Sequence, residues 1–242
     1  MAEFKLPTEI VSLPSKGLLY PEDNPLSSGQ VEMKYMTAKE EDILTNQSYI
    51  QNGTVIDKLL QSLIVSEVNY NDLLIGDKNA LLIASRILGY GADYKFTYNG
   101  QEEVVDLNDL NEKEIDESLY QKGVNRFTFE LPSTGATVVF RLLTHGDEIK
   151  IQNEIKGLQK LNPNASPEAT TRLKHMIISV DGKEERKDVR DFVDNYLLAR
   201  DARAFREYIS QIQPDVDLTF FPSRGERTGT IPIGLNFFWP DV

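Results

Sequence analysis

The sequence predicts an α+β protein made of two tandem copies of one module, each with a small antiparallel sheet or hairpin and a helical cluster. The first observation is a repeat: residues 13–17 (LPSKG) return as residues 131–135 (LPSTG). After each copy, a short alternating strand leads into a helix that begins at a threonine, and each half closes with a hairpin pattern. A separation of more than about a hundred residues is too long for a solenoid, so two copies of one domain are expected.

Four segments follow from this pattern. We expect an extended, Pro-rich N-terminal arm at 1–30, a first α+β module at 31–110, an acidic connector at 111–124, and a second α+β module at 125–242 with an aromatic tail. Proline disfavours helix in the residue before it, and the arm holds four prolines. The apolar residues of the arm must be buried, either on their own domain or on a partner subunit; the sequence leaves both open.

The first module begins with a strand at 31–35. Thr37 and Glu40 have capping-box spacing, which predicts a helix from Thr37 to about 46–49. Apolar residues at helical spacing predict a second helix from 55 to 64. A third is expected at 79–88, with Asp77 as its N-cap and glycines at its end. Alternating aromatic residues around Asn99-Gly100 then predict a hairpin at 94–105.

The second module is expected to repeat this order. Strands are predicted at 126–131 and 137–142, and a helix at 146–160. Ser166 as N-cap and Pro167 at the first helical position predict a helix at 167–180. Two further helices, at 189–198 and 202–212, lead to a closing hairpin around Arg224-Gly225. Agreement between these local signals favours duplication more than the short repeat alone.

Composition excludes several classes of protein. The 242 residues are 40% hydrophobic and 26% charged, which is ordinary for a folded soluble protein. The net charge of −12 opposes binding to nucleic acid, which requires a positive surface. The absence of cysteine excludes disulfides, thiol nucleophiles and Cys-based zinc sites. No apolar run reaches the roughly 20 residues of a membrane span, and the N-terminus lacks a signal-peptide pattern. We therefore expect a soluble, cytoplasmic-type protein that binds neither nucleic acid nor membrane.

No catalytic constellation is apparent. The chain has no phosphate-binding glycine loop and no GxSxG elbow. His145 and His175 are isolated in the sequence, so capping, core or surface roles explain them better than catalysis. Capping likewise explains the acidic pair Glu40 and Glu41. We expect no enzymatic activity, no catalytic residue, no metal and no cofactor.

Two apolar segments are candidates for docking on a protein partner. One is Leu18, Leu19 and Tyr20 in the arm; the other is Phe237, Phe238 and Trp239 at the chain end. Aromatic residues are enriched at interface hot spots, but they also fill cores. Whether either segment packs on its own domain or on a partner is open at this stage.

Several segments together resemble a known family. They are LPSKGLLYP, VEMKYMTAKEEDILTNQSYIQNGTVIDKLLQSLI, LLIGDKNALLIASRILGYGADY, ARDARAFREYISQIQPDVDL and the terminal FFWP. The pattern, over residues 10–242, resembles the T4-type bacteriophage baseplate hub assembly proteins, the T4 baseplate protein family. The resemblance implies a non-catalytic role in building the hub of a contractile-tail baseplate through contacts with other baseplate hub proteins. Such a protein works in the host cytoplasm during assembly as a chaperone or scaffold, or stays in the tail baseplate of the virion as a hub subunit. Oligomeric state is left open.

The chain departs from this family in its hairpins. Some relatives carry CxxC-type pairs there, like small zinc ribbons, whereas residues 94–105 and 220–232 contain no cysteine. A zinc ribbon needs about four Cys or His ligands. We therefore expect hairpins that are held by cross-strand packing.

Two other functions remain as alternatives. One is a metal-dependent hydrolase whose site is assembled from scattered carboxylates. The other is a cytoplasmic adaptor with no connection to phage assembly.

Overall fold

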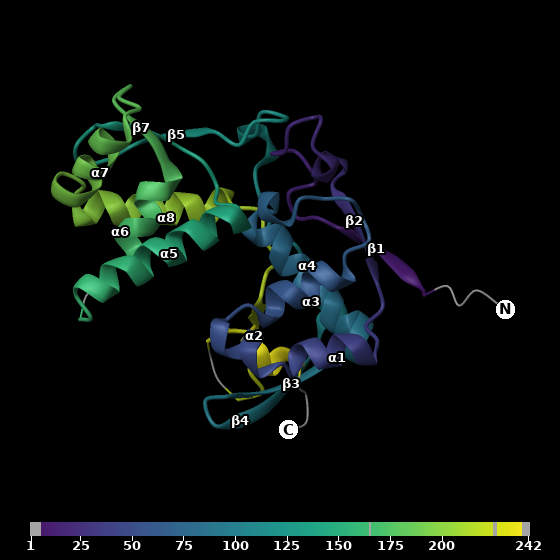
Figure 1. The fold of residues 1–242 in the computed structure, drawn as a ribbon. Helices are drawn as coiled ribbons and strands as arrows, with labels where there is room; N and C mark the ends of the chain where they lie inside the picture. The colour runs from purple at the N-terminus through teal and green to yellow at the C-terminus, as the bar shows by residue number, and fades with distance from the viewer. Residues whose placement is uncertain (1–5, 165, 225–226, 239–242) are drawn as a thin grey trace.

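The computed structural model describes residues 6–164, 166–224 and 227–238, and it has the α+β architecture that the sequence predicts (Figure 1). The first half contains, in chain order, β1 (Thr8–Ser12), β2 (Gln30–Lys34), α1 (Ala38–Leu44), α2 (Gln47–Asn52), α3 (Val55–Leu63), α4 (Ile75–Tyr90), β3 (Asp93–Tyr98) and β4 (Gln101–Asp106). The second contains β5 (Phe127–Glu130), β6 (Thr137–Phe140), α5 (His145–Leu161), α6 (Glu168–Met176), β7 (Ile177–Val180), α7 (Arg186–Asn195), α8 (Ala199–Ile212), β8 (Thr219–Phe220) and β9 (Gly229–Thr230). In the described part of the chain, no helix is both long and apolar enough to cross a membrane.

The N-terminal segment folds back onto its own chain. Strand β1 pairs antiparallel with β2, with Val11 opposite Val31. Between these strands, Leu13, Leu19 and Leu26 are buried in the core. The segment is therefore part of the first sheet and core. Of the two alternatives for its apolar residues, packing on their own domain or on a partner subunit, the structure shows the first for Leu13, Leu19 and Leu26.

Capping explains where several helices begin. Thr37 and Glu40 form the predicted capping box of α1. That helix ends at Leu44, earlier than expected, because the Asn46 side chain accepts hydrogen bonds from Ser48 N and Tyr49 N and starts a separate helix, α2. The predicted cap at Asp77 is wrong: α4 begins at Ile75, and Asp77 is the third residue of the helix.

The predicted helix at 167–180 is wrong in its second half. Helix α6 ends at Met176, and residues 177–180 form β7, the third strand of the sheet β5-β6-β7. These four residues read IISV, and β-branched side chains favour a strand wherever a partner strand is available. The N-cap of α6 is Pro167 instead of Ser166.

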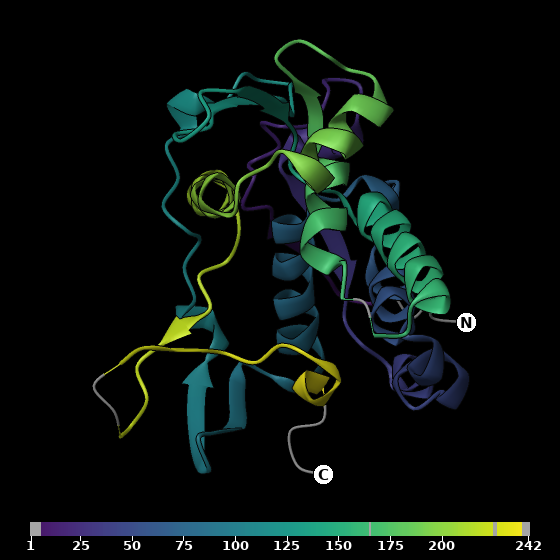
Figure 2. The same cartoon turned by 90° about the vertical axis from the view of Figure 1, so that its left-hand side faces the viewer.

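The molecule has two lobes, and the chain crosses between them twice (Figure 1). Helices α1–α4 with β3 and β4 form one lobe, and α5–α8 with β5–β7 form the other. After α8, the chain returns to the first lobe, where the C-terminal segment lies beside the β3–β4 hairpin (Figure 2). Ser223 N and Oγ donate to the buried carboxylate of Glu103 in β4 at 3.1 and 2.5 Å, which fastens the two hairpins together. The final hairpin therefore completes the first lobe.

Aromatic packing joins the β3–β4 hairpin to the β8–β9 hairpin. Asn99 and Gly100 have positive φ and form the tight turn between β3 and β4. Phe220 in β8 packs edge-to-face on Phe96 and Tyr98, with ring centroids 5.0 and 5.1 Å apart.

Candidate partner-docking site

The first predicted docking segment lies over the start of α4. Ser15 N and Oγ donate to the Asp77 carboxylate at 2.9 and 2.7 Å, and the Tyr20 hydroxyl donates to it at 2.6 Å. Gly17 sits in the tight turn with φ of 75°, and a Cβ there would lie 2.4 Å from the Ser27 carbonyl oxygen. Leu19 and Tyr20 are buried, and Leu18 is half-buried. The geometry therefore places Leu19 and Tyr20 in the core of their own lobe.

Burial controls the protonation of this cluster. It raises the pKa of Asp77 above its ordinary value, and the hydrogen bonds from Tyr20 and Ser15 act in the opposite direction. Burial also raises the pKa of Tyr20, and the nearby Asp77 charge raises it further. Tyr20 therefore stays a neutral donor, and its hydroxyl in turn accepts a hydrogen bond from Leu74 N at 2.8 Å.

A matching arrangement occurs in the second lobe. Asp201, fully buried, accepts hydrogen bonds from Ser133 N at 2.7 Å and Thr134 Oγ1 at 3.0 Å. Asp201 is the third residue of α8, just as Asp77 is the third residue of α4. Sequence reasoning gave Asp77 an N-cap role and did not single out Asp201, although LLIGD and LLARD share the spacing that would have indicated a common role.

The first two residues of the second predicted docking segment are also in the core. Phe237 and Phe238 are fully buried, and the Phe237 ring meets Tyr94 edge-to-face at 4.8 Å. The Phe237 carbonyl accepts a hydrogen bond from Nε of the buried Arg86 at 3.0 Å. Arg86, which the sequence did not single out, also donates to the carbonyl oxygens of Gly91 and Asp93, at 2.6 and 3.0 Å.

The structure does not bring the two predicted docking segments together. Tyr20 contacts the first turn of α4, whereas Phe237 is held by Arg86 near the opposite end of that helix. Trp239 lies outside the described residues. A docking role therefore stays a prediction for Trp239 and for the exposed part of Leu18.

Other apolar side chains are accessible. Phe221 is 86% exposed, because it follows Phe220, which points into the aromatic cluster. Tyr196 and Leu198, at the corner between α7 and α8, are 63% and 50% exposed. These side chains are candidates for contact with a partner, and sequence reasoning placed them inside predicted elements instead.

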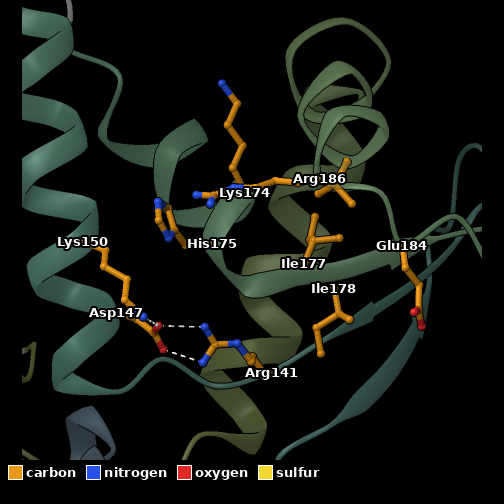
Figure 3. A pocket seen from close by; sticks show the side chains of 10 residues that line it. Arg141, Asp147, Lys150, Lys174, His175, Ile177, Ile178, Glu184 and Arg186 are labelled. Carbon is orange, nitrogen blue, oxygen red and sulfur yellow. Dashed lines mark hydrogen bonds and ion pairs between the residues drawn. The ribbon is translucent and has the colours of Figure 1, made fainter. Parts of the chain in front are cut away.

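A cavity of about 250 Å³ opens between α5, α6 and β7, and charged side chains line much of it (Figure 3). Arg141 binds the Asp147 carboxylate through two hydrogen bonds of 2.5 and 2.7 Å. Asp147 also forms the capping box of α5 with Thr144. Burial opposes ionisation of Asp147, but these hydrogen bonds outweigh it and lower its pKa to about 2. Asp147 is therefore a permanently ionised capping group and is a poor proton donor or acceptor for catalysis at neutral pH.

His175 lines the same cavity and also interacts with a carboxylate. Its Nε2 lies 2.9 Å from Glu154 Oε2, and Arg190 contacts the same carboxylate at 2.8 Å. Lys174 pairs with Asp194 at 2.5 Å. The Lys150 ammonium lies 3.5 Å from Asp147 Oδ1, so this charge of the lining is also paired within the protein (Figure 3).

His145 lies at the junction of the two lobes. Its backbone N donates to Leu73 O at 2.8 Å, and its ring packs edge-to-face on Tyr70. The Lys78 ammonium, 3.1 Å from Nδ1, can only donate, so the ring proton lies on Nε2, 3.7 Å from Asp57. Burial lowers the pKa of His145, and the Lys78 charge lowers it further. The neutral imidazole therefore acts as a structural link between the lobes.

A scan against protein-family models, a search of curated proteins and a search of solved structures each gave no match. Among the described residues, no three His, Asp or Glu side chains converge in a way that could hold a metal ion.

Proposed function

We propose that this chain is a non-catalytic baseplate hub protein that acts in phage tail assembly by binding other hub proteins, and that its two lobes derive from tandem copies of one module. The phage assignment rests on the resemblance of residues 10–242 to the T4-type family. The observation that supports binding is the exposure of Phe221, 86%, next to Phe220 and Ser223, which pack on or bind the β3–β4 hairpin. Exposed aromatic side chains of this kind are enriched in protein–protein interfaces.

The matched geometry of the two halves supports the tandem copies. Lys34, Thr37 and Glu40 form an ion-paired capping box, and Arg141, Thr144 and Asp147 form another with the same spacing. The residue after α3 bridges to β2 (Met33 opposite Ile64), and the residue after α6 bridges to β6 (Phe140 opposite Ile177). In each half, the backbone N–H of the LPS serine, Ser15 or Ser133, donates a hydrogen bond to an aspartate, Asp77 or Asp201. Each aspartate is the third residue of a long helix.

Quantitative mass spectrometry of purified virions and of assembly intermediates tests this function. A hub subunit is expected in the virion in a fixed ratio to the other hub proteins. A transient chaperone or scaffold is expected in the intermediates and not in the virion. Absence from both contradicts the proposal and favours the adaptor or the hydrolase, which Mg²⁺ or Mn²⁺ titration then separates.

A point variant tests the surface itself. Phe221→Ala is expected to keep the fold and to reduce the amount of chain that co-purifies with assembly intermediates. Arg203→Ala truncates a side chain that is 78% exposed on α8 and serves as the control. Equal recovery of both variants would show that Phe221 is not part of the docking surface.

A further inference from the structure

Strand β1 has one free edge. Tyr35 N donates to Pro7 O, and Leu13 N donates to Gly29 O, so alternate residues of β1 direct their backbone groups toward β2. In an antiparallel pair, the intervening residues direct their N–H and C=O groups the other way. Thr8 and Ile10 are such residues, and no strand in the described part of the chain pairs with their edge.

The positions of β1 whose backbone groups point toward this edge carry no charged side chain and no proline. Natural proteins protect edge strands with charged side chains, bulges or a covering element. Here the outward-facing positions are occupied by Leu6, Thr8 and Ile10; Leu6 is 47% exposed and Ile10 is 67% exposed. Helix α4 approaches only the Ser12 end, where Ala80 and Ala84 line a small groove beside it. The open part of the edge therefore runs from Leu6 to Ile10.

We propose that β1 pairs antiparallel with β1 of a second copy of this chain, in a register centred on Thr8. Thr8 then faces Thr8 of the partner subunit, and Leu6 faces Ile10 of the partner subunit. All of these positions direct their backbone groups outward, so they form the hydrogen-bonded pairs of the new ladder. The pairing extends the two strands of each subunit into one four-stranded sheet and gives an isologous two-fold dimer.

The order of side chains along the edge favours a second copy as the occupant. The outward residues read Leu-Thr-Ile, so antiparallel self-pairing places each exposed apolar residue against another one. Glu9 faces Pro7 of the partner subunit, so no like charges oppose each other across the new ladder. A register centred on Ile10 would instead place the added strand alongside Ser12, where α4 lies.

Single cysteine variants test the register, because the chain has no cysteine of its own. Directly opposed residues of a hydrogen-bonded antiparallel pair have Cα atoms about 5.5 Å apart, within the range of a disulfide. Two Ile10 positions would lie more than about 12 Å apart in this register, which is beyond that range. Oxidation of Thr8→Cys is therefore expected to give a covalent dimer with at least a tenfold higher yield than Ile10→Cys. Equal yields from the two variants, or a higher yield from Ile10→Cys, would overturn the register.

Sedimentation tests the dimer independently of the cross-link. The unmodified chain is expected to reach about twice the 27.5 kDa mass of one copy as its concentration rises. Ile10→Lys is expected to remain at the mass of one copy. Val104→Lys, which makes the same charge change at a position 55% exposed on β4, is expected to dimerise like the unmodified chain. A chain that stays monomeric up to its solubility limit, or a dimer that Ile10→Lys leaves intact, would overturn the proposal.

Discussion

Replacement of Phe237 by alanine is expected to destabilise the first lobe strongly. The Phe237 side chain is fully buried, and its ring contacts Tyr94 and Phe238 at centroid distances of 4.8 and 5.5 Å. Truncation of a buried Phe to Ala lowers the free energy of unfolding by about 3–5 kcal/mol. The lost edge-to-face contacts account for about 0.5–1.5 kcal/mol of that change for each pair. For a chain of this length, about 2–4 °C of melting temperature corresponds to 1 kcal/mol, so a decrease of about 6–20 °C is expected.

Thermal unfolding followed by circular dichroism measures this decrease. Phe221→Ala removes the same side chain from a position 86% exposed, so its free energy of unfolding should change by no more than about 0.5 kcal/mol. A Phe237→Ala protein that melts like the unmodified chain would refute the assignment of the tail to the core. The same conclusion would follow if both alanine variants lost equal stability.

Four further substitutions give separate tests. Gly76→Ala places a Cβ 1.8 Å from the Pro214 carbonyl oxygen and should lower the free energy of unfolding in urea by about 3 kcal/mol or more. In contrast, Gly157→Ala meets nothing within 4 Å on α5 and should raise it by about 0.5–1 kcal/mol. The folded-state pKa of His145 lies below 6.5, so the unfolded chain takes up the proton first and stability should fall as the pH drops below about 6.5. His145→Gln should flatten that slope, and an unchanged slope would exclude His145 as its source. The pKa of Asp147 falls from 3.8 to about 2 in the folded chain, so about 2 kcal/mol of stability should be present above pH 4 and lost toward pH 2. Asp147→Asn should remove this acid-dependent part of the unfolding curve.

Local signals in the sequence predicted local structure correctly. The capping box of Thr37 and Glu40 is fixed by residues three positions apart, and the Asn99-Gly100 turn by two adjacent residues with positive φ. Such features depend on few other parts of the chain, so the sequence alone is sufficient to predict them.

Features that depend on distant partners were missed. Residues 177–180 have the apolar character of a buried helix end, and only pairing with β6 makes them a strand. Asp77 resembles an N-cap in sequence, and its three hydrogen bonds come from Ser15 and Tyr20, far earlier in the chain. The burial of Phe237 could not be predicted for the same reason, since an exposed and a buried phenylalanine look alike in sequence and only the fold distinguishes Phe221 from Phe237.

The two aspartate loops show one way in which the first half differs from the second. Between its LPS loop and β2, the first half has a longer connection than the second half has between its LPS loop and β6, and that extra segment supplies Tyr20. Tyr20 provides the third hydrogen bond to Asp77, whereas in the second half Thr134, inside the loop itself, donates to Asp201. If the halves are copies, the longer connection added a distant hydroxyl donor to the local one, Ser15 Oγ, and, through Leu19 and Leu26, added side chains to the core of the first lobe. The arm therefore contributes to the stability of the lobe that it covers, and Tyr20→Phe, which removes only the hydroxyl, should lower the free energy of unfolding by about 1–3 kcal/mol.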